Sequence, residues 1–156
     1  MQPVGRFVVD ARGAVPFLPH DDILAVARDT TSDLMPTYGW GFEVGAHVYP
    51  FRWKVMTFGI GASYLLTRGS RTPPALEDAD EPSGPTVTTR FRAFSPQVSF
   101  NFGHRMGWSY LSGGIGRSTL RAWRDDLVED AGAAAKTINY GGGARWFINP
   151  HVAFGL

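Results

Sequence analysis

A small set of charged and titratable residues lies inside segments that otherwise alternate between large apolar and small side chains. The set comprises Asp10, Arg12, Glu43, His47 and Arg145, with Arg117 as a further candidate. A charge taken out of water must be paired, so these residues are expected to form an ion-paired network if their segments enclose an interior. Such a network could plug or gate a narrow passage, or it could be a static core that makes the fold unique. We favour the static core.

Catalytic arrangements are weakly represented among the same residues. His47 and Glu43 share one face of a predicted strand, but four residues of extended chain separate their side chains by about 13 Å, too far for a hydrogen bond. His104 lies in a predicted turn near Ser109, and no catalytic triad emerges from either pair. The sequence therefore predicts no catalytic residue and a protein that is not an enzyme.

Oxygen-rich and glycine-rich segments also have simple explanations. His20-Asp21-Asp22 and residues 77–81 could hold calcium or magnesium, but they lack the spacing of an EF-hand and are expected to be solvated loops. The glycine clusters at 113–116 and 141–143 match no dinucleotide fingerprint and no P-loop. Glycine inside a strand permits bending or close packing. We expect no metal ion and no cofactor.

Six arginines border the predicted long connections and could bind phosphate groups. Guanidinium groups form strong, charge-assisted hydrogen bonds with phosphate oxygens. The predicted partner is the phosphate of lipopolysaccharide, held at a rim of Arg68, Arg71, Arg90, Arg92, Arg121 and Arg124.

Composition limits the class of protein that these residues serve. The 156-residue chain has 19 glycines, 13% aromatic residues, no cysteine and a formal net charge of +1. That charge is too small for the basic field of a nucleic-acid-binding protein, so nucleic acid is not an expected partner. No run of about 18 apolar residues predicts a membrane-spanning helix. A chain too aromatic for disorder and too glycine-rich for a helical bundle is expected to form one all-β domain over residues 1–156.

Period-two alternation marks seven predicted strands. In most of them, large residues occupy one face and glycine, serine, threonine or asparagine occupies the other. Glycines blur both faces of residues 108–123, so the facing of that strand stays unassigned. The predicted strands cover residues 6–14, 38–48, 54–66, 92–102, 108–123, 137–147 and 151–156.

Connections alternate between short and long, which is typical of an up-and-down meander with two different ends. The short ones lie near residues 49–53, 103–107 and 148–150, and the long ones near 16–36, 69–88 and 125–135. Of the 14 acidic residues, only Asp10 and Glu43 fall within predicted strands. Residues 21–28 carry acids at the start and an arginine at the end, as a short helix prefers. The pattern indicates tight turns at one end and elaborate loops at the other, as in outer-membrane barrels.

Side-chain volume decides which face points outward. A barrel of about eight strands has an interior just wide enough for side chains or one small ligand. The large set, including Phe58, Phe94 and Trp146, would overfill that interior, so we expect it to face lipid. Aromatic residues near both ends predict two interfacial girdles. The girdle near the short turns would contain Tyr49, Phe51, Trp53, Phe102, Trp108, Tyr110, Trp146 and Phe147, and the other Tyr38, Trp40, Tyr64, Phe91, Trp123 and Tyr140.

Three runs resemble the OmpA-like family of small outer-membrane β-barrels. They are residues 39–49 (GWGFEVGAHVY), 95–102 (SPQVSFNF) and 140–150 (YGGGARWFINP). The resemblance implies an antiparallel up-and-down transmembrane β-barrel of eight strands in the outer membrane of a Gram-negative-type bacterium, surrounded by outer-membrane lipid and inserted by the barrel assembly machinery. About seven strands are present, so the sequence predicts a C-terminal truncation and an unpaired edge between the first and last strands.

The expected function is that of a non-enzymatic envelope protein with a structural or surface role. Permeability would be narrow at most, because eight strands leave a filled lumen. Two alternatives stay open: a soluble lipocalin-like ligand-binding barrel and a lipid A-modifying barrel enzyme. Dependence on detergent would distinguish the membrane barrel from the soluble barrel, and activity on lipid A would test the enzyme alternative.

Overall fold

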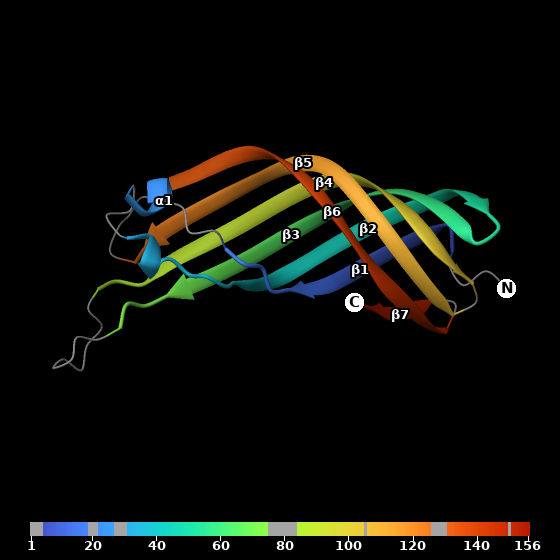
Figure 1. Ribbon diagram of the computed structural model, residues 1–156, viewed down its shortest axis with the longest axis horizontal. Helices are drawn as coiled ribbons and strands as arrows, with labels where there is room; N and C mark the ends of the chain where they lie inside the picture. The colour runs from blue at the N-terminus through green and yellow to red at the C-terminus, as the bar shows by residue number, and fades with distance from the viewer. Residues whose placement is uncertain are drawn as a thin grey trace.

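The chain folds into one antiparallel sheet that curls on itself (Figure 1). The computed structural model describes residues 5–18, 22–26, 31–74, 84–104, 106–125, 131–149 and 151–156. Its seven strands pair in chain order, each antiparallel to the next. The prediction of an all-β, up-and-down meander with seven strands is confirmed.

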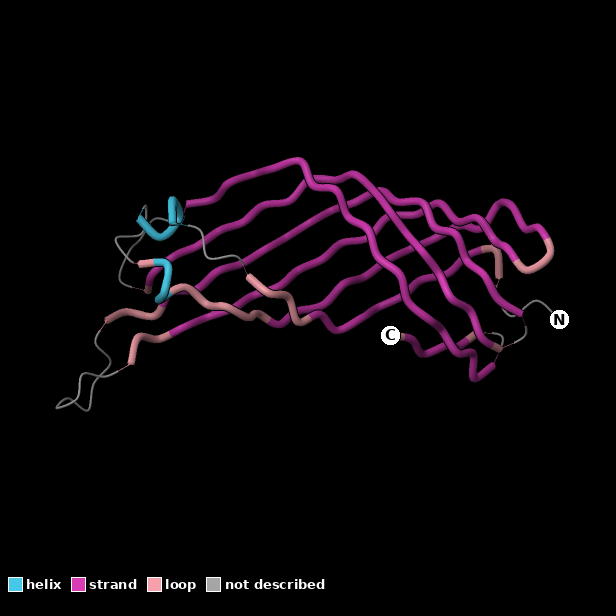
Figure 2. The backbone as a smooth tube through the Cα atoms, in the orientation of Figure 1, coloured by secondary structure: helices cyan, strands magenta, loops and turns pink. Residues whose placement is uncertain are grey.

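The strands lengthen from the chain's start toward its sixth strand. They are β1 (Phe7–Ala14), β2 (Trp40–Trp53), β3 (Met56–Arg71), β4 (Val87–His104), β5 (Gly107–Arg124), β6 (Ala131–Asn149) and β7 (Val152–Gly155). Two short helices, α1 (Asp22–Val26) and the 3-10 helix η1 (Ser32–Leu34), lie between β1 and β2 at the end that carries the long connections (Figure 2). Helix α1 confirms the central part of the predicted helix; residues 21 and 27–28 lie outside the described residues. None of the described helices is long and apolar enough to cross a membrane.

Three strands reach further toward the long connections than the sequence predicts. β3 continues to Arg71 and β4 begins at Val87, so they are joined by residues 72–86. β6 begins at Ala131, six residues before the predicted start. These extensions consist mostly of glycine, alanine, serine, threonine and arginine, with single Val87, Phe91 and Lys136, and their side chains do not alternate regularly in size. The period-two signal therefore stops before the backbone pairing does.

The two faces of the sheet differ sharply in chemistry. On the outward face, Trp40 is 74% exposed and Phe94 53% exposed. On the inward face, Gln97 is 7% exposed and Asn101 only 2%. The predicted outward orientation of the large residues is confirmed; Phe58, which is half-buried, packs on that face against its cross-strand neighbour Phe100, with 5.4 Å between ring centroids.

A β-bulge near the end of β2 re-aims the last residues of that strand. Val48 pairs with Ile60, but the next pair is Phe51 with Phe58, so β2 holds one extra residue here. The extra residue turns Phe51 outward while Tyr49 stays inside. The predicted turn at 49–53 is therefore wrong: these residues continue β2, and the turn is Lys54–Val55.

The predicted aromatic girdle near the short turns is only partly correct. Tyr49, Trp108 and Tyr110 are buried inside the curled sheet, and Phe147 packs against this cluster. At the other end, Phe91 is half-buried on the inward face. Tyr49, Trp108 and Tyr110 fit inside because a glycine on a neighbouring strand leaves room for each ring. A Cβ on Gly59, for example, would stand 2.6 Å from the ring of Tyr49.

β1 and β7 form the two edges of the sheet. In the described residues β1 pairs only with β2, and β7 only with β6. An opening of about 720 Å³ lies between them, lined by β1 together with the end of β6 and β7. The predicted unpaired edge is thus present.

Candidate functional site

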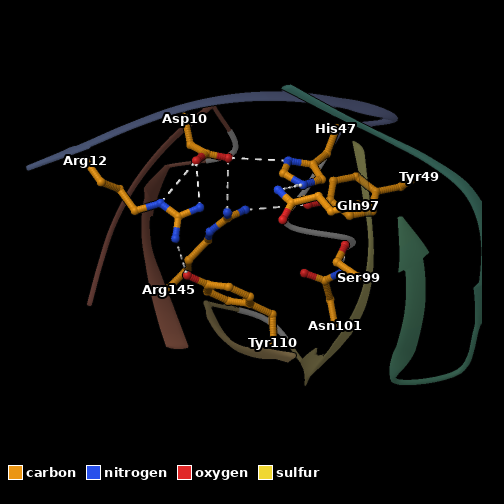
Figure 3. Close-up of polar contacts among 9 residues, drawn as sticks. All are labelled: Asp10, Arg12, His47, Tyr49, Gln97, Ser99, Asn101, Tyr110 and Arg145. Atoms are coloured by element: carbon orange, nitrogen blue, oxygen red, sulfur yellow. Dashed lines mark hydrogen bonds and ion pairs between the residues drawn. The ribbon is translucent and has the colours of Figure 1, made fainter. Parts of the chain in front are cut away.

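Asp10 on β1 is the centre of a polar network inside the curled sheet (Figure 3). Its Oδ1 accepts hydrogen bonds from Arg12, from Nε at 3.2 Å and from Nη2 at 3.0 Å. Its Oδ2 accepts a hydrogen bond from Nη2 of Arg145 at 3.2 Å. The side chains of Asp10 and Arg145 are each 14% exposed. One carboxylate therefore holds two guanidinium groups in a largely water-excluded interior, and it ties β1 to β6.

Two tyrosines hold the other sides of the guanidinium groups. Arg12 Nη1 donates to Tyr110 Oη at 2.8 Å, and Arg145 Nη1 donates to Tyr49 Oη at 3.5 Å. Both cations also lie near the ring of Tyr110, 5.7 Å and 4.8 Å from its centroid. Because an aromatic ring attracts a cation, Tyr110 helps to offset the excess of two positive groups over one carboxylate.

His47 extends the network across β2 toward β4. Its Nδ1 lies 3.5 Å from Asp10 Oδ2, and its Nε2 lies 3.0 Å from Nε2 of Gln97. With the amide of Gln97 as donor, His47 carries its proton on Nδ1, the atom that faces Asp10. The imidazole Nε2 thus contacts an amide rather than a serine or threonine hydroxyl, so His47 does not form the nucleophile–base pair of a hydrolase.

Asn101 forms a second polar layer beside Gln97. Its Nδ2 donates to Ser99 Oγ at 3.1 Å and to the backbone oxygen of Thr57 at 3.2 Å. Asn101, Ser99 and Thr57 are all at least 95% buried. The interior is therefore polar over several neighbouring strands.

Glu43 faces the same interior but stays outside the ion pairs. It stands directly opposite Arg12 in the pairing of β1 with β2, and the two residues line one cavity. Arg12 turns toward Asp10 instead, and among the described residues no carboxylate other than Asp10 contacts it. The structure thus brings four of the five predicted interior residues into one network and places Glu43 at its border.

Arg117 is not part of the interior, contrary to the sequence-based suggestion. It is exposed and stands opposite Phe94 in the pairing of β4 with β5, so both side chains occupy the outward face. The glycines of β5 hid the facing of this strand in the sequence. Ser118 is buried and accepts a hydrogen bond from Thr137 Oγ1 at 2.6 Å, so the even-numbered residues of β5 point inward.

Tyr49, Gln97 and Tyr110 are network residues that the sequence-based reasoning missed. The sequence predicts both tyrosines in the girdle near the short turns, and Gln97 falls on the face of residues 92–102 that carries the small side chains. Gln97 carried a usable signal, because it is a long polar side chain on the face predicted to point inward. Tyr49 carried a signal too, because it continues the alternation that places Glu43 and His47 on the inward face, and the bulge begins only after it.

The side chains of the network leave little space among themselves, although they also border the opening between β1 and β7. The space left among its side chains is about 10 Å³, which is room for about one water molecule. A larger cavity of about 260 Å³ lies on the side of the long connections, lined in part by Arg12, Glu43 and Asn139. At that end, Ala25 of α1 and Met35 pack against Ala122 of β5. The interior is therefore hollow toward the long connections and narrow among the network side chains, while Asp10, Arg12 and Arg145 also line the opening between β1 and β7.

The six predicted rim arginines divide between the two faces. By strand alternation, four of them lie on the outward face, namely Arg68, Arg90, Arg92 and Arg121. The other two, Arg71 and Arg124, stand at strand ends in positions that alternate inward. Arg68 and Arg90 lie over the ring of Trp123, at 5.6 Å and 5.0 Å from its centroid.

Metal binding finds no support in the part of the chain that the structure describes, where no three histidine or acidic residues are placed to share an ion. His20, Asp21 and residues 77–81 lie outside the described residues, and so does the side chain of His104. Comparison of the chain with protein-family models, curated proteins and solved structures gives no match. The family resemblance accordingly stays a prediction.

Proposed function

We propose that this chain is a β-barrel protein of a bacterial outer membrane, with a structural or surface role and at most narrow permeability. The observation that carries the proposal is the inverted distribution of side chains. Trp40, Phe94 and Ile60 are each more than half exposed, whereas Thr57, Ser99 and Asn101 are buried. This is the pattern of strands that alternate apolar-out and polar-in within a bilayer.

A soluble ligand-binding barrel needs the opposite arrangement. Such a barrel encloses its apolar side chains and presents polar ones to water. Here the face that would bind an apolar ligand carries the ion pair of Asp10 with Arg145 and the amide of Gln97. The outward face of β4, from Phe94 to Phe102, exposes an apolar residue at every second position. Water would be a poor solvent for that surface.

The interior explains why permeability should be narrow. The guanidinium groups of Arg12 and Arg145 are held by Asp10, Tyr110 and Tyr49. Among these side chains there is room for about one water molecule. Release of the plug would break several charge-assisted hydrogen bonds at once, so a static barrel is favoured over a gated pore.

The proposed surroundings follow from the same two faces. The apolar outward face would contact outer-membrane lipid, the long-loop end would face lipopolysaccharide, and the barrel assembly machinery would insert the chain. A lipid A-modifying enzyme would need a nucleophile beside a base. His47, the histidine of the interior network, contacts Asp10 and Gln97, so we propose no enzymatic activity.

A charge placed on the outward face tests the membrane assignment. Val98 lies near the middle of β4 and is 43% exposed. In hydrocarbon, Val98→Arg should lower the free energy of unfolding by about 2–4 kcal/mol. On a water-facing surface the same change should cost less than about 0.5 kcal/mol. Urea unfolding of the protein in phosphatidylcholine vesicles, followed by tryptophan fluorescence, measures the difference.

Val15→Arg is the matched control, because Val15 is 75% exposed but follows the end of β1. It should leave stability nearly unchanged in the same vesicles. Equal stabilities for both variants, or a wild-type chain that stays soluble and folded without detergent or lipid, would contradict the membrane proposal.

A further inference from the structure

Three neighbouring strands carry an unbalanced positive charge. β3, β4 and β5 contain seven arginines and no aspartate or glutamate. Five of these arginines lie on the outward face by strand alternation, namely Arg68, Arg90, Arg92, Arg117 and Arg121. The outward face therefore has a basic zone toward the long-loop end of these strands.

The register concentrates part of this charge in one row. Arg90 on β4 stands directly opposite Arg68 on β3 and directly opposite Arg121 on β5. Like charges in directly opposed positions destabilise a sheet. The directly opposed Arg68 and Arg90 are therefore costly neighbours unless an anion lies against them.

The ring of Trp123 contacts two arginines of this row. The guanidinium carbons of Arg68 and Arg90 lie 5.6 Å and 5.0 Å from the centroid of its ring, so two cations lie close to one aromatic ring. Among the described residues, no carboxylate forms an ion pair with either arginine. Their hydrogen-bond donors are thus available to an anion on this face, and planar guanidinium groups match the oxygens of a phosphate.

The neighbouring surface identifies what kind of phosphate would fit. Tyr64 on β3 and Phe94 on β4 stand opposite each other on the same outward face, four residues along each strand from Arg68 and Arg90. Further along, Ile60 and Val98 are also exposed and directly opposed. A basic row that borders an apolar surface is complementary to an amphiphile with an anionic head and an apolar tail.

We propose that Arg68 and Arg90, held by Trp123, bind the phosphate of an anionic membrane lipid on the outward face of the sheet. Arg92 and Arg121 lie beside them and add positive charge. The site rests on the proposed membrane-barrel function, and it narrows the predicted rim to its outward members. Arg71 and Arg124 play no part in it.

The affinity of the vesicle-folded protein for lipid A tests the site. The wild-type chain and an Arg68→Gln/Arg90→Gln variant are folded in phosphatidylcholine vesicles and titrated with bisphosphorylated lipid A or its dephosphorylated form. Loss of two guanidinium groups should weaken binding of the bisphosphorylated form by at least about tenfold. The dephosphorylated form should bind weakly to both proteins. Arg71→Gln/Arg124→Gln, which removes equal charge at the same end of β3 and β5, should bind like wild type.

Each outcome bears on the site separately from the barrel. Folding in the vesicles is measured first, by resistance to protease, and its failure for the wild type refutes the barrel proposal. Normal folding of all proteins with unchanged lipid A affinity in Arg68→Gln/Arg90→Gln refutes the phosphate site alone. Equal weakening in both double variants also refutes it, because only bulk charge would matter. Displacement of lipid A by millimolar inorganic phosphate would assign the site to a free anion and overturn the lipid proposal.

Discussion

Removal of the carboxylate at the centre of the interior network should be the most damaging polar substitution in the chain. Asp10→Asn keeps the shape of the side chain but removes the charge that holds Arg12 and Arg145. Three hydrogen bonds between 3.0 and 3.2 Å lose the negative charge of their acceptor. The amide NH2 group also places a donor where an acceptor stood.

The expected loss follows from the burial of the two partners. Breaking a buried ion pair by removing one member costs about 3–5 kcal/mol, because the other charge stays buried without compensation. Arg145 is 14% exposed and should bear nearly this full cost. Arg12 is 34% exposed and stands opposite Glu43, so it can recover part of its loss by turning to that carboxylate. We expect Asp10→Asn to lower the free energy of unfolding by about 3 kcal/mol.

Urea unfolding in phosphatidylcholine vesicles measures this change, and Glu43 supplies the control. Glu43→Gln removes an acid from the same interior, but one that holds no described cation, so it should cost less than about 1 kcal/mol. The double variant should lose more than the sum of the two, since Arg12 then has neither carboxylate. Equal losses for Asp10→Asn and Glu43→Gln, or strict additivity, would refute the reasoning.

Two further predictions concern the space inside the sheet. Gly59→Ala should lower the free energy of unfolding by about 1–3 kcal/mol, because its Cβ would stand 2.6 Å from the ring of Tyr49. Gly141→Ala is the control and should leave stability unchanged, because a Cβ there would meet nothing within 4 Å. Equal losses for the two variants in urea unfolding would contradict this prediction. Arg145→Ala should enlarge the constriction of about 10 Å³ and raise single-channel conductance in planar bilayers, whereas the outward Arg92→Ala should leave conductance at the wild-type level. Unchanged conductance in Arg145→Ala would show that the network does not block the passage.

The strands that alternate in size were predictable from the sequence alone. Phe94, Val98 and Phe100 all lie on one face of β4, because they are separated by even numbers of residues. A period of two assigns each residue to one of two faces, so only the choice of the outward face is left open. The volume of the large side chains correctly predicted that their face is the outward one. The extension of β6 back to Ala131 was not predictable, because a run of alanines has no large and small faces to compare.

The membership of the interior network was predictable only in part. Asp10, Arg12, His47 and Arg145 were found because buried charges must pair, and the structure brings them within hydrogen-bond or close electrostatic reach. The contacts of Tyr110 depend on how β5 faces, which its glycines obscure. The position of Glu43 outside the ion pairs depends on a competition between two carboxylates for one arginine, and no residue pattern decides that.

The extra residue in β2 makes the tip of its hairpin a place where the strand can lose one residue without any side chain changing face. Deletion of Pro50 would restore simple alternation, because Phe51 would follow Tyr49 directly and still pair with Phe58. Tyr49 would stay inside, and Phe51 and Trp53 would stay outside. A one-residue deletion elsewhere in a strand turns every following side chain to the other face, whereas here the bulge already holds the residue that would be removed.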